Sequence, residues 1–211
     1  MFEKVVGFLS GKKTRTDCSV VLSPTGNVKG EAKIVCELFK NGLGLYHLRK
    51  PRWTREKFAE WLKQIPKEFR ARIVVHQFPE LVEKFGLGGF HLGIGVSVPG
   101  NFTETLSAQC ASYADIEQVA PACRYVLLGP IFPSGNRDLT VPARTPAEFA
   151  AALSYWRKKG GRAKVFAFGG VNAGNIKTCK KLGFDGFATV SAIWDSEDGP
   201  VKAFKALRKK W

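Results

Sequence analysis

The sequence predicts an α/β fold, a (β/α)8 TIM barrel built as a single domain. Three observations support this: short apolar runs alternate regularly with helical patterns, the apolar runs are continuous, and eight repeats fit within about 190 residues. Continuous apolar strands separated by helices indicate a parallel sheet that helices cover. A chain of 211 residues with 45% hydrophobic residues can bury a core of that size.

Each predicted element follows from a local pattern. In chain order, the strands are the apolar runs at residues 19–23, 43–48, 72–76, 88–92, 105–109, 124–128, 164–168 and 186–190. The helical patterns between them cover residues 30–42, 54–65, 79–86, 112–120, 145–160, 172–183 and 199–210. After the fourth strand, the loop 93–104 replaces the helix or leaves room for a short one. An open doubly wound sheet is the structural alternative, and it is disfavoured because no G-x-G-x-x-G pattern opens the first unit.

The ends, the cysteines and the hydropathy place the chain in a broad class. We expect residues 1–17 to be an N-terminal extension and residues 18–211 to form the barrel. No run reaches the roughly 18 apolar residues of a membrane span, and the first residues do not form a secretory signal, so we expect a cytoplasmic protein without membrane contact. The five cysteines are odd in number and widely spaced, which is typical of reduced core thiols.

The formal net charge of +15 favours anionic partners. Much of the excess lies in "GKKTRTD", "YWRKKGGRAK" and "ALRKKW", which look like helix ends, loops and a tail, and cations near helix carboxyl ends complement the helix dipole. No zinc-finger spacing or aromatic-rich platform accompanies these runs, so nucleic acid is not the expected partner. Small phosphorylated molecules are therefore the expected anionic partners.

A barrel of this kind carries its active site at the carboxyl ends of the strands, with phosphate often held after the last two strands. Gly169 and Gly170 follow the seventh strand, and Val190 and Ser191 follow the eighth. Their backbone N–H groups and the serine hydroxyl are candidate phosphate ligands, because glycine lets the backbone approach a ligand closely. The structural alternative is that a Gly pair only makes a tight turn.

Further polar side chains follow the second and sixth strands. Ser134, Asn136 and Arg137 lie in the loop after the sixth strand and are candidate donors to phosphate, or else belong to a solvated loop. Arg49 is predicted to point inward at the barrel rim, where an unpaired buried charge would need an anion. Lys50 points the other way, toward packing or the surface.

All three histidines of the chain are expected near the same rim, on neighbouring strands. His47, His76 and His91 follow or end the second, third and fourth strands. A three-histidine zinc site is one reading of them. A hydrogen-bonded barrel-core role for His91 is the simpler alternative.

Several motifs resemble those of the thiamine phosphate synthase and thiazole tautomerase superfamily. "YHLRKP" resembles its Q-x-R-x-K motif, "GGFHLG" its G-x-H-L-G, "ASYADIEQV" its H-S-x-x-E, and "YVLLGPIFPSGNRD" its Y-V-G-L-G-P-I-F-P-T-x-T-K. "FAFGGVNAGNI" and "GFDGFATVSAIW" are similar to I-G-G-I-x-x-x-N and G-A-D-G-V-A-V-x-S-A-I. Order and spacing agree from about Ser19 to Trp194.

The resemblance implies a (β/α)8 transferase that joins hydroxymethylpyrimidine pyrophosphate to hydroxyethylthiazole phosphate, giving thiamine phosphate and pyrophosphate. It assigns the thiazole phosphate to Ser134, Asn136, Gly169, Gly170, Val190 and Ser191. It assigns the pyrophosphate to His47, Arg49, His76 and Arg137, with Arg49, His76 and Arg137 as the catalytic residues. Positioned cations would neutralise the charge of the leaving pyrophosphate. The implied partners are these small phosphorylated substrates, and a homodimer is an expected state.

The resemblance also implies Mg²⁺ as a cofactor, but the chain departs from the family at the metal ligands. Two aspartates of the family correspond here to Gln77 and Val96, which do not replace carboxylates on a hard cation. Pro51 takes the place of the strand-two lysine, and Pro130 takes the place of a histidine of the tautomerase branch. Two alternatives follow: histidines and arginines neutralise pyrophosphate without a carboxylate-bound metal, or the chain binds thiazole phosphate without condensing it.

Overall fold

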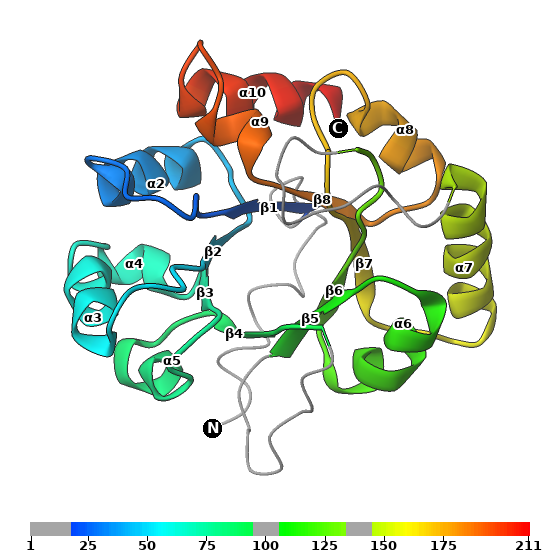
Figure 1. Ribbon diagram of the computed structural model, residues 1–211, viewed down its shortest axis with the longest axis horizontal. Helices are drawn as coiled ribbons and strands as arrows, with labels where there is room; N and C mark the ends of the chain where they lie inside the picture. Colours follow the sequence, from blue (N-terminus) through cyan, green and yellow to red (C-terminus); the bar gives the residue numbers. More distant parts are fainter. Residues whose placement is uncertain (1–17, 95–105, 134–144) are drawn as a thin grey trace.

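The computed structural model describes residues 18–94, 106–133 and 145–211 and shows a closed barrel of eight parallel strands. Each strand pairs with the next, and β8 pairs with β1. Figure 1 looks onto the end of the barrel where the strands finish. The strands are β1 (Ser19–Leu22), β2 (Leu45–Leu48), β3 (Ile73–Val75), β4 (Gly89–Leu92), β5 (Leu106–Cys110), β6 (Tyr125–Leu128), β7 (Lys164–Ala167) and β8 (Gly186–Thr189). The TIM barrel prediction is confirmed, strand by strand.

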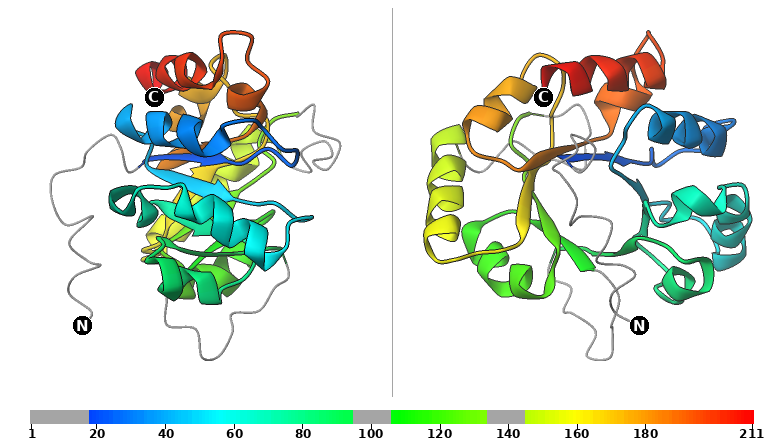
Figure 2. Two further views of the ribbon diagram at one scale, coloured as in Figure 1. Left: turned by 90° about the vertical axis from the view of Figure 1, so that its left-hand side faces the viewer. Right: turned by 180° about the vertical axis from the view of Figure 1, so that it is seen from behind.

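Helices form a ring outside the strands (Figures 1 and 2). They are α2 (Glu31–Lys40), α3 (Arg55–Lys63), α4 (Lys67–Arg70), α5 (Glu80–Phe85), α6 (Tyr113–Val119), η2 (Ala120–Ala122), α7 (Pro146–Lys158), α8 (Ile176–Lys181), α9 (Ser191–Trp194) and α10 (Pro200–Lys210). All seven predicted helices are present. The short helices α4, η2 and α9 were not predicted, because one turn is too short to show a helical period. Across the described ranges, no helix is both long and apolar enough to cross a bilayer.

Side-chain caps fix where three of these helices begin. The Thr54 side chain accepts a hydrogen bond from the backbone of α3. Ser112 with Asp115, and Thr145 with Glu148, form reciprocal capping boxes at α6 and α7. Each cap satisfies backbone N–H groups that the first helical turn leaves unpaired. These three helices therefore start at defined residues.

The apolar core has two parts. The larger lies between the strands and the helices, and the smaller lies inside the barrel. The inner residues come from β1, β6, β7 and β8 or the positions after them: Val20, Leu22, Tyr125, Leu127, Phe166, Phe168 and Ala188. At the alternating inward positions of β2 to β5, the barrel carries His47, His91 and Ser107 instead. The polar groups of the barrel interior therefore gather on one side, beside Leu45 of β2, which packs against the inner apolar cluster.

Lys50 lies outside the barrel wall and is fully buried, so of the two predicted alternatives packing is confirmed and the surface is excluded. Its ammonium donates to the Glu31 carboxylate at 2.6 Å and to the carbonyls of Pro24 and Gly26 at 2.8 and 2.7 Å. The Tyr46 hydroxyl donates to the other oxygen of Glu31 at 2.8 Å. A buried charge persists only with such partners. The Lys50–Glu31 pair thus ties the end of β2 to the loop after β1 and to α2.

Candidate active site

Three histidines from neighbouring strands meet inside the mouth of the barrel, and we call them the histidine cluster. His47 on β2 and His91 on β4 are buried, whereas His76, directly after β3, is partly exposed. His47 Nδ1 lies 3.0 Å from His76 Nε2, and the rings of His76 and His91 are 4.3 Å apart between centroids. The structure therefore brings together the three histidines that the sequence placed on neighbouring strands.

The outer nitrogens of the cluster are held by residues of β5 and β6. His47 Nε2 is hydrogen-bonded to the Tyr125 hydroxyl, and His91 Nδ1 lies 2.9 Å from Ser107 Oγ. His91 Nε2 is buried and has no hydrogen-bond partner among the described residues. His91 is thus hydrogen-bonded in the barrel core through Nδ1, as expected, whereas its Nε2 has no partner among the described residues.

Burial keeps the cluster neutral. Loss of water around the rings lowers the pKa of His47 and of His76 well below the usual value, and the neighbouring His91 lowers both further. Burial also lowers the pKa of His91 to about 3, with a smaller contribution from the Arg49 charge. Neutral imidazoles can donate and accept hydrogen bonds but carry no charge. The cluster therefore presents hydrogen-bonding groups rather than charges, and the charge beside it comes from Arg49.

Arg49 stands at the end of β2 and is exposed, so the predicted unpaired buried charge was wrong. Its backbone is fixed, because its N–H donates to Ser23 Oγ and its carbonyl accepts from the same hydroxyl, both at 2.8 Å. Its charge lies close enough to lower the pKa of His76 and His91. Arg49 consequently presents a cation at the mouth beside the histidine cluster, and it makes no ion pair within the described residues.

The glycine pair after β7 is required by its neighbours. Gly169 and Gly170 have φ values of 85° and 66°, which favour glycine. A Cβ on Gly169 would lie 2.6 Å from Pro130 Cα, and one on Gly170 would lie 2.5 Å from the carbonyl oxygen of Pro133. The N–H of Phe132 donates to the carbonyl of Gly169 at 3.2 Å. The loop after β6 and the turn after β7 are therefore packed against each other.

The glycine turn after β7 and the residues after β8 both carry backbone N–H groups without a hydrogen-bond acceptor among the described residues. Within the described ranges, the backbone N–H groups of Gly169, Gly170, Val190 and Ser191 donate to no acceptor. Ser191 is exposed and Val190 is half-buried, while Thr189 bonds across to the turn after β7 through its hydroxyl and the Val171 carbonyl, at 2.9 Å. Neighbouring strands β7 and β8 thus place four predicted residues at the same edge of the mouth. We call these residues the amide cradle.

Other predicted residues fall outside the described ranges. Ser134, Asn136 and Arg137 lie in 134–144 and Val96 lies in 95–105. Their roles stay predictions. The N-terminal extension, residues 1–17, likewise lies outside the described part.

The described residues do not fit Mg²⁺. Gln77 has a buried amide oxygen without a hydrogen-bond partner, but no carboxylate joins it in a cluster: within the described ranges, only the three histidines form a group that could hold a metal ion. Magnesium prefers oxygen ligands, carboxylates above all, over imidazole nitrogen. No step of the chemistry below is therefore assigned to Mg²⁺.

Sequence reasoning missed three polar residues of the site. Tyr125 and Ser107 hold the histidine cluster from inside the barrel, and Ser23 fixes the backbone of Arg49. The available signal was the period of two along each strand, which places Ser107 and Tyr125 at inward positions. A polar group at an inward position needs a polar partner, and the histidines are that partner.

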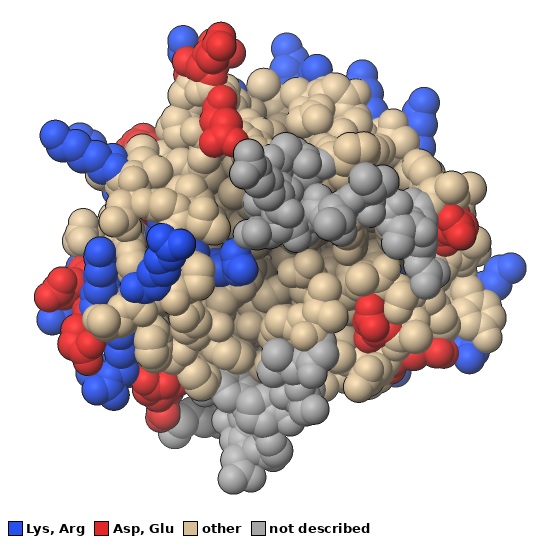
Figure 3. Space-filling model, in the orientation of Figure 1, with Lys and Arg blue, Asp and Glu red and all other residues tan. Residues whose placement is uncertain are grey.

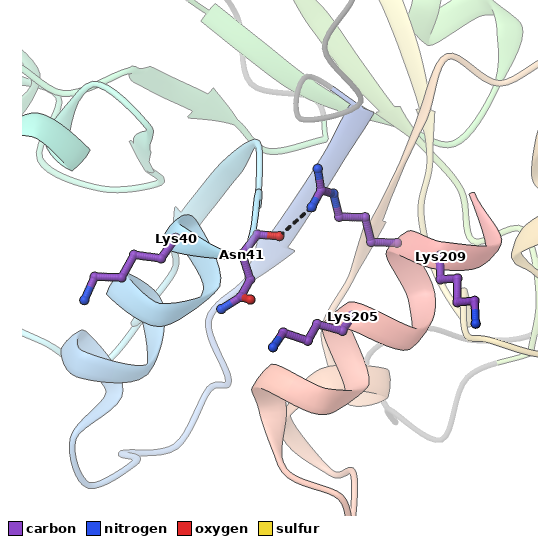
Figure 4. A pocket seen from close by; sticks show the side chains of 5 residues that line it. Lys40, Asn41, Lys205 and Lys209 are labelled. Atoms are coloured by element: carbon purple, nitrogen blue, oxygen red, sulfur yellow. Dashed lines mark hydrogen bonds between the residues drawn. The ribbon is translucent and has the colours of Figure 1, made fainter.

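On the face that carries the mouth, the charged side chains of the described residues do not make one continuous patch. Figure 3 shows Lys and Arg spread around the rim of this face and mixed with Asp and Glu. Away from the mouth, a hollow of about 410 Å³ lies between α2 and α10. It is lined by Lys40, Asn41, Lys205, Arg208 and Lys209 (Figure 4). Except for Lys205 in the middle of α10, these residues lie at or near helix carboxyl ends, where cations are stabilising. The helix dipoles therefore account for most of the positive charge around this hollow.

The fold and the mouth define a (β/α)8 barrel with its polar groups at the carboxyl ends of the strands, as barrel enzymes have. The chain belongs to the thiamine monophosphate synthase family, whose model matches residues 19–193.

Two curated relatives are similar over most of their length. A thiamine-phosphate synthase of Desulfitobacterium hafniense is 25% identical over 182 residues, covering 82% of this chain and 85% of the relative. One of Halorhodospira halophila is 29% identical over 188 residues, covering 84% and 87%. Among solved structures, a thiamine phosphate pyrophosphorylase from Bacteroides thetaiotaomicron has a TM-score of 0.77 at 27% identity, covering 92% of this chain and 96% of that one. The family resemblance that the motifs indicated is confirmed.

Proposed function

We propose that this chain is a transferase that joins hydroxymethylpyrimidine pyrophosphate to hydroxyethylthiazole phosphate, giving thiamine phosphate and pyrophosphate. The observation that carries the proposal is the amide cradle, four residues whose unused backbone donors lie at one edge of the mouth. Backbone N–H groups of this kind suit a phosphate. Ser134 and Asn136 are proposed to add side-chain donors to the same phosphate.

The reaction asks little covalent chemistry of the protein. The thiazole nitrogen attacks the methylene carbon of the pyrimidine, the bond from that carbon to oxygen breaks, and pyrophosphate leaves with the electron pair. The electron-rich pyrimidine stabilises positive charge on the methylene carbon. The protein must hold the two reactants together and neutralise the leaving group.

Arg49 is the described residue best placed for that neutralisation, because it carries a cation beside the mouth and makes no ion pair with a described residue. A guanidinium also matches phosphate oxygens in pairs. Arg137 is proposed as a second cation, and His76 as a neutral hydrogen-bonding group at the edge of the pyrophosphate. His47 is buried with both nitrogens engaged, so its proposed effect on substrate passes through His76.

The test is a direct assay of tag-free protein with both precursors, with and without added Mg²⁺, beside a thiamine-phosphate synthase of known activity. Formation of thiamine phosphate is expected. Arg49→Ala should lower kcat/KM about 100-fold, in line with loss of a donor to a developing negative charge. Arg55→Ala is the matched control, because Arg55 pairs with Glu56 on the outer surface.

Absence of product under conditions where the known synthase works would overturn the transferase proposal. The specific departures from the family at Gln77 and Val96 favour one second candidate, a protein that binds thiazole phosphate without condensing it. Calorimetry with thiazole phosphate separates the two, since binding without turnover supports the second candidate and absence of both removes the amide cradle as a phosphate site.

A further inference from the structure

We propose that the histidine cluster is a binding site for one divalent transition-metal ion, Zn²⁺ foremost, held by His47 Nδ1, His76 Nε2 and His91 Nε2. The site shares His47 and His76 with the proposed pyrophosphate end of the reaction, but the inference concerns metal binding alone, and its test measures no turnover.

The distances are close to those that a metal ion requires. One ligand nitrogen from each of the three residues lies within 4.8 Å of the others, and the His47 and His76 nitrogens are 3.0 Å apart. Around a tetrahedral zinc ion with Zn–N distances of about 2.0–2.1 Å, two nitrogens are about 3.3 Å apart. The His47–His76 pair is therefore almost in place, and the proposal requires the His91 ring to bring its nitrogen closer to them.

An unsatisfied nitrogen points to a missing ligand at this place. His91 Nε2 is buried, has no hydrogen-bond partner among the described residues, and belongs to a ring whose other nitrogen bonds Ser107. A ring that donates from Nδ1 has its lone pair on Nε2. Buried polar atoms normally have a partner, and a metal ion would supply one here.

The surroundings match those of histidine metal ligands. A ligating histidine usually gives its second ring N–H to a fixed acceptor, which sets its tautomer and orientation. His47 Nε2 lies against the Tyr125 hydroxyl and His91 Nδ1 against Ser107 Oγ, and we assign these two oxygens as the acceptors. These two bonds leave His47 Nδ1 and His91 Nε2 as the inner nitrogens of the two rings.

Charge at the site favours an anion as the fourth ligand. The Arg49 cation opposes a bare metal ion but attracts an anion bound to it. His76 is the partly exposed member, so the fourth position opens toward the mouth, where water or a phosphate oxygen can complete the coordination.

The chain offers an unusually direct test, because its three histidines are all in the cluster. Tag-free protein labelled with ¹⁵N-histidine is stripped with a chelator and titrated with Zn²⁺ alone. We expect one bound Zn²⁺ per chain by equilibrium dialysis and elemental analysis, together with shifts of all three imidazole resonances that end at one equivalent. Less than stoichiometric binding, or imidazole resonances that do not move, would overturn the proposal on the wild-type protein alone.

Variants identify the ligands. His47→Gln installs the glutamine of the Q-x-R-x-K motif and His76→Asn removes the imidazole. Each should weaken Zn²⁺ binding at least 100-fold, while Tyr125→Phe should weaken it about 10-fold through the lost outer bond. Cys36→Ser, on α2, is the control and should leave the affinity unchanged. Substitution with Co²⁺ tests the donor atoms: a spectrum without a thiolate-to-cobalt band is expected. A thiolate band, or affinity that survives both histidine changes in folded protein, would place the metal elsewhere.

Discussion

Replacing Lys50 by Met should destabilise the fold far more than replacing an exposed lysine. The Lys50 side chain is fully buried and the Glu31 side chain is 3% exposed, and the ammonium has three oxygen acceptors within 2.8 Å. In the variant, the Glu31 carboxylate stays buried with only the Tyr46 hydroxyl as donor. Removing one partner of a buried ion pair costs about 3–5 kcal/mol of unfolding free energy.

Urea unfolding measures this loss. With a slope of about 2 kcal/mol per molar urea, a loss of about 4 kcal/mol moves the midpoint down by about 2 M. Lys40→Met is the matched control, because Lys40 and its partner Glu37 are 60% and 44% exposed and such a pair contributes less than about 1 kcal/mol. Adding Glu31→Gln to Lys50→Met should recover part of the loss, since no charge is then left buried. A Lys50→Met midpoint equal to that of Lys40→Met would refute the reasoning.

Three further outcomes are expected. Gly170→Ala should lower the free energy of unfolding by about 1–3 kcal/mol and weaken thiazole phosphate binding, because the new Cβ meets the β6 loop at a positive φ. Urea unfolding measures the stability and calorimetry measures the binding. Stability should be full above about pH 6.5 and fall as the pH drops toward 3, because His91 has a folded pKa of about 3 and the unfolded chain takes up its proton near 6.5. His91→Asn should make that slope shallower in urea unfolding between about pH 6.5 and 5 by the share of His91 only, because the lowered pKa values of His47 and His76 contribute to it as well. In the native protein, Cys110 and Cys179 should resist a thiol reagent at pH 8, since burial raises the pKa of each thiol to about 12.

Each of the three has a contrary result. Gly170→Ala with wild-type stability and affinity would show that the β6 loop yields to a methyl group. An acid profile for His91→Asn that is as steep as the wild type would place the proton uptake on other groups. Rapid labelling of both buried thiols in folded protein would contradict their burial.

The strands and long helices were predictable because their patterns are local. A continuous apolar run or a capped amphipathic stretch carries its own signal, as at β6 and α7. One-turn helices such as α9 form from tertiary contacts, including the Trp194 indole bonding to the Leu22 carbonyl at 2.8 Å, which no local pattern contains.

The site was predictable only in part, for a similar reason. Strand alternation predicts that the side chains of His47 and Arg49 both point inward. How deeply each is buried depends on how far it lies from the end of β2 at the mouth. His47 is therefore sealed within the barrel while Arg49 reaches solvent. The burial of Lys50 depends on Glu31, nineteen positions earlier, and such pairings are set by the closed fold.

The contact between the β6 loop and the glycine turn after β7 has a consequence for protein engineering. The carbonyls of Phe168 and Gly169 accept hydrogen bonds from Ile131 and Phe132, so each segment is a template for the other's backbone. A loop transplanted from a relative after the sixth strand alone would lack the matching backbone segment after β7 that holds it by hydrogen bonds. Exchange of this part of the barrel should succeed only when both segments are transplanted as one block.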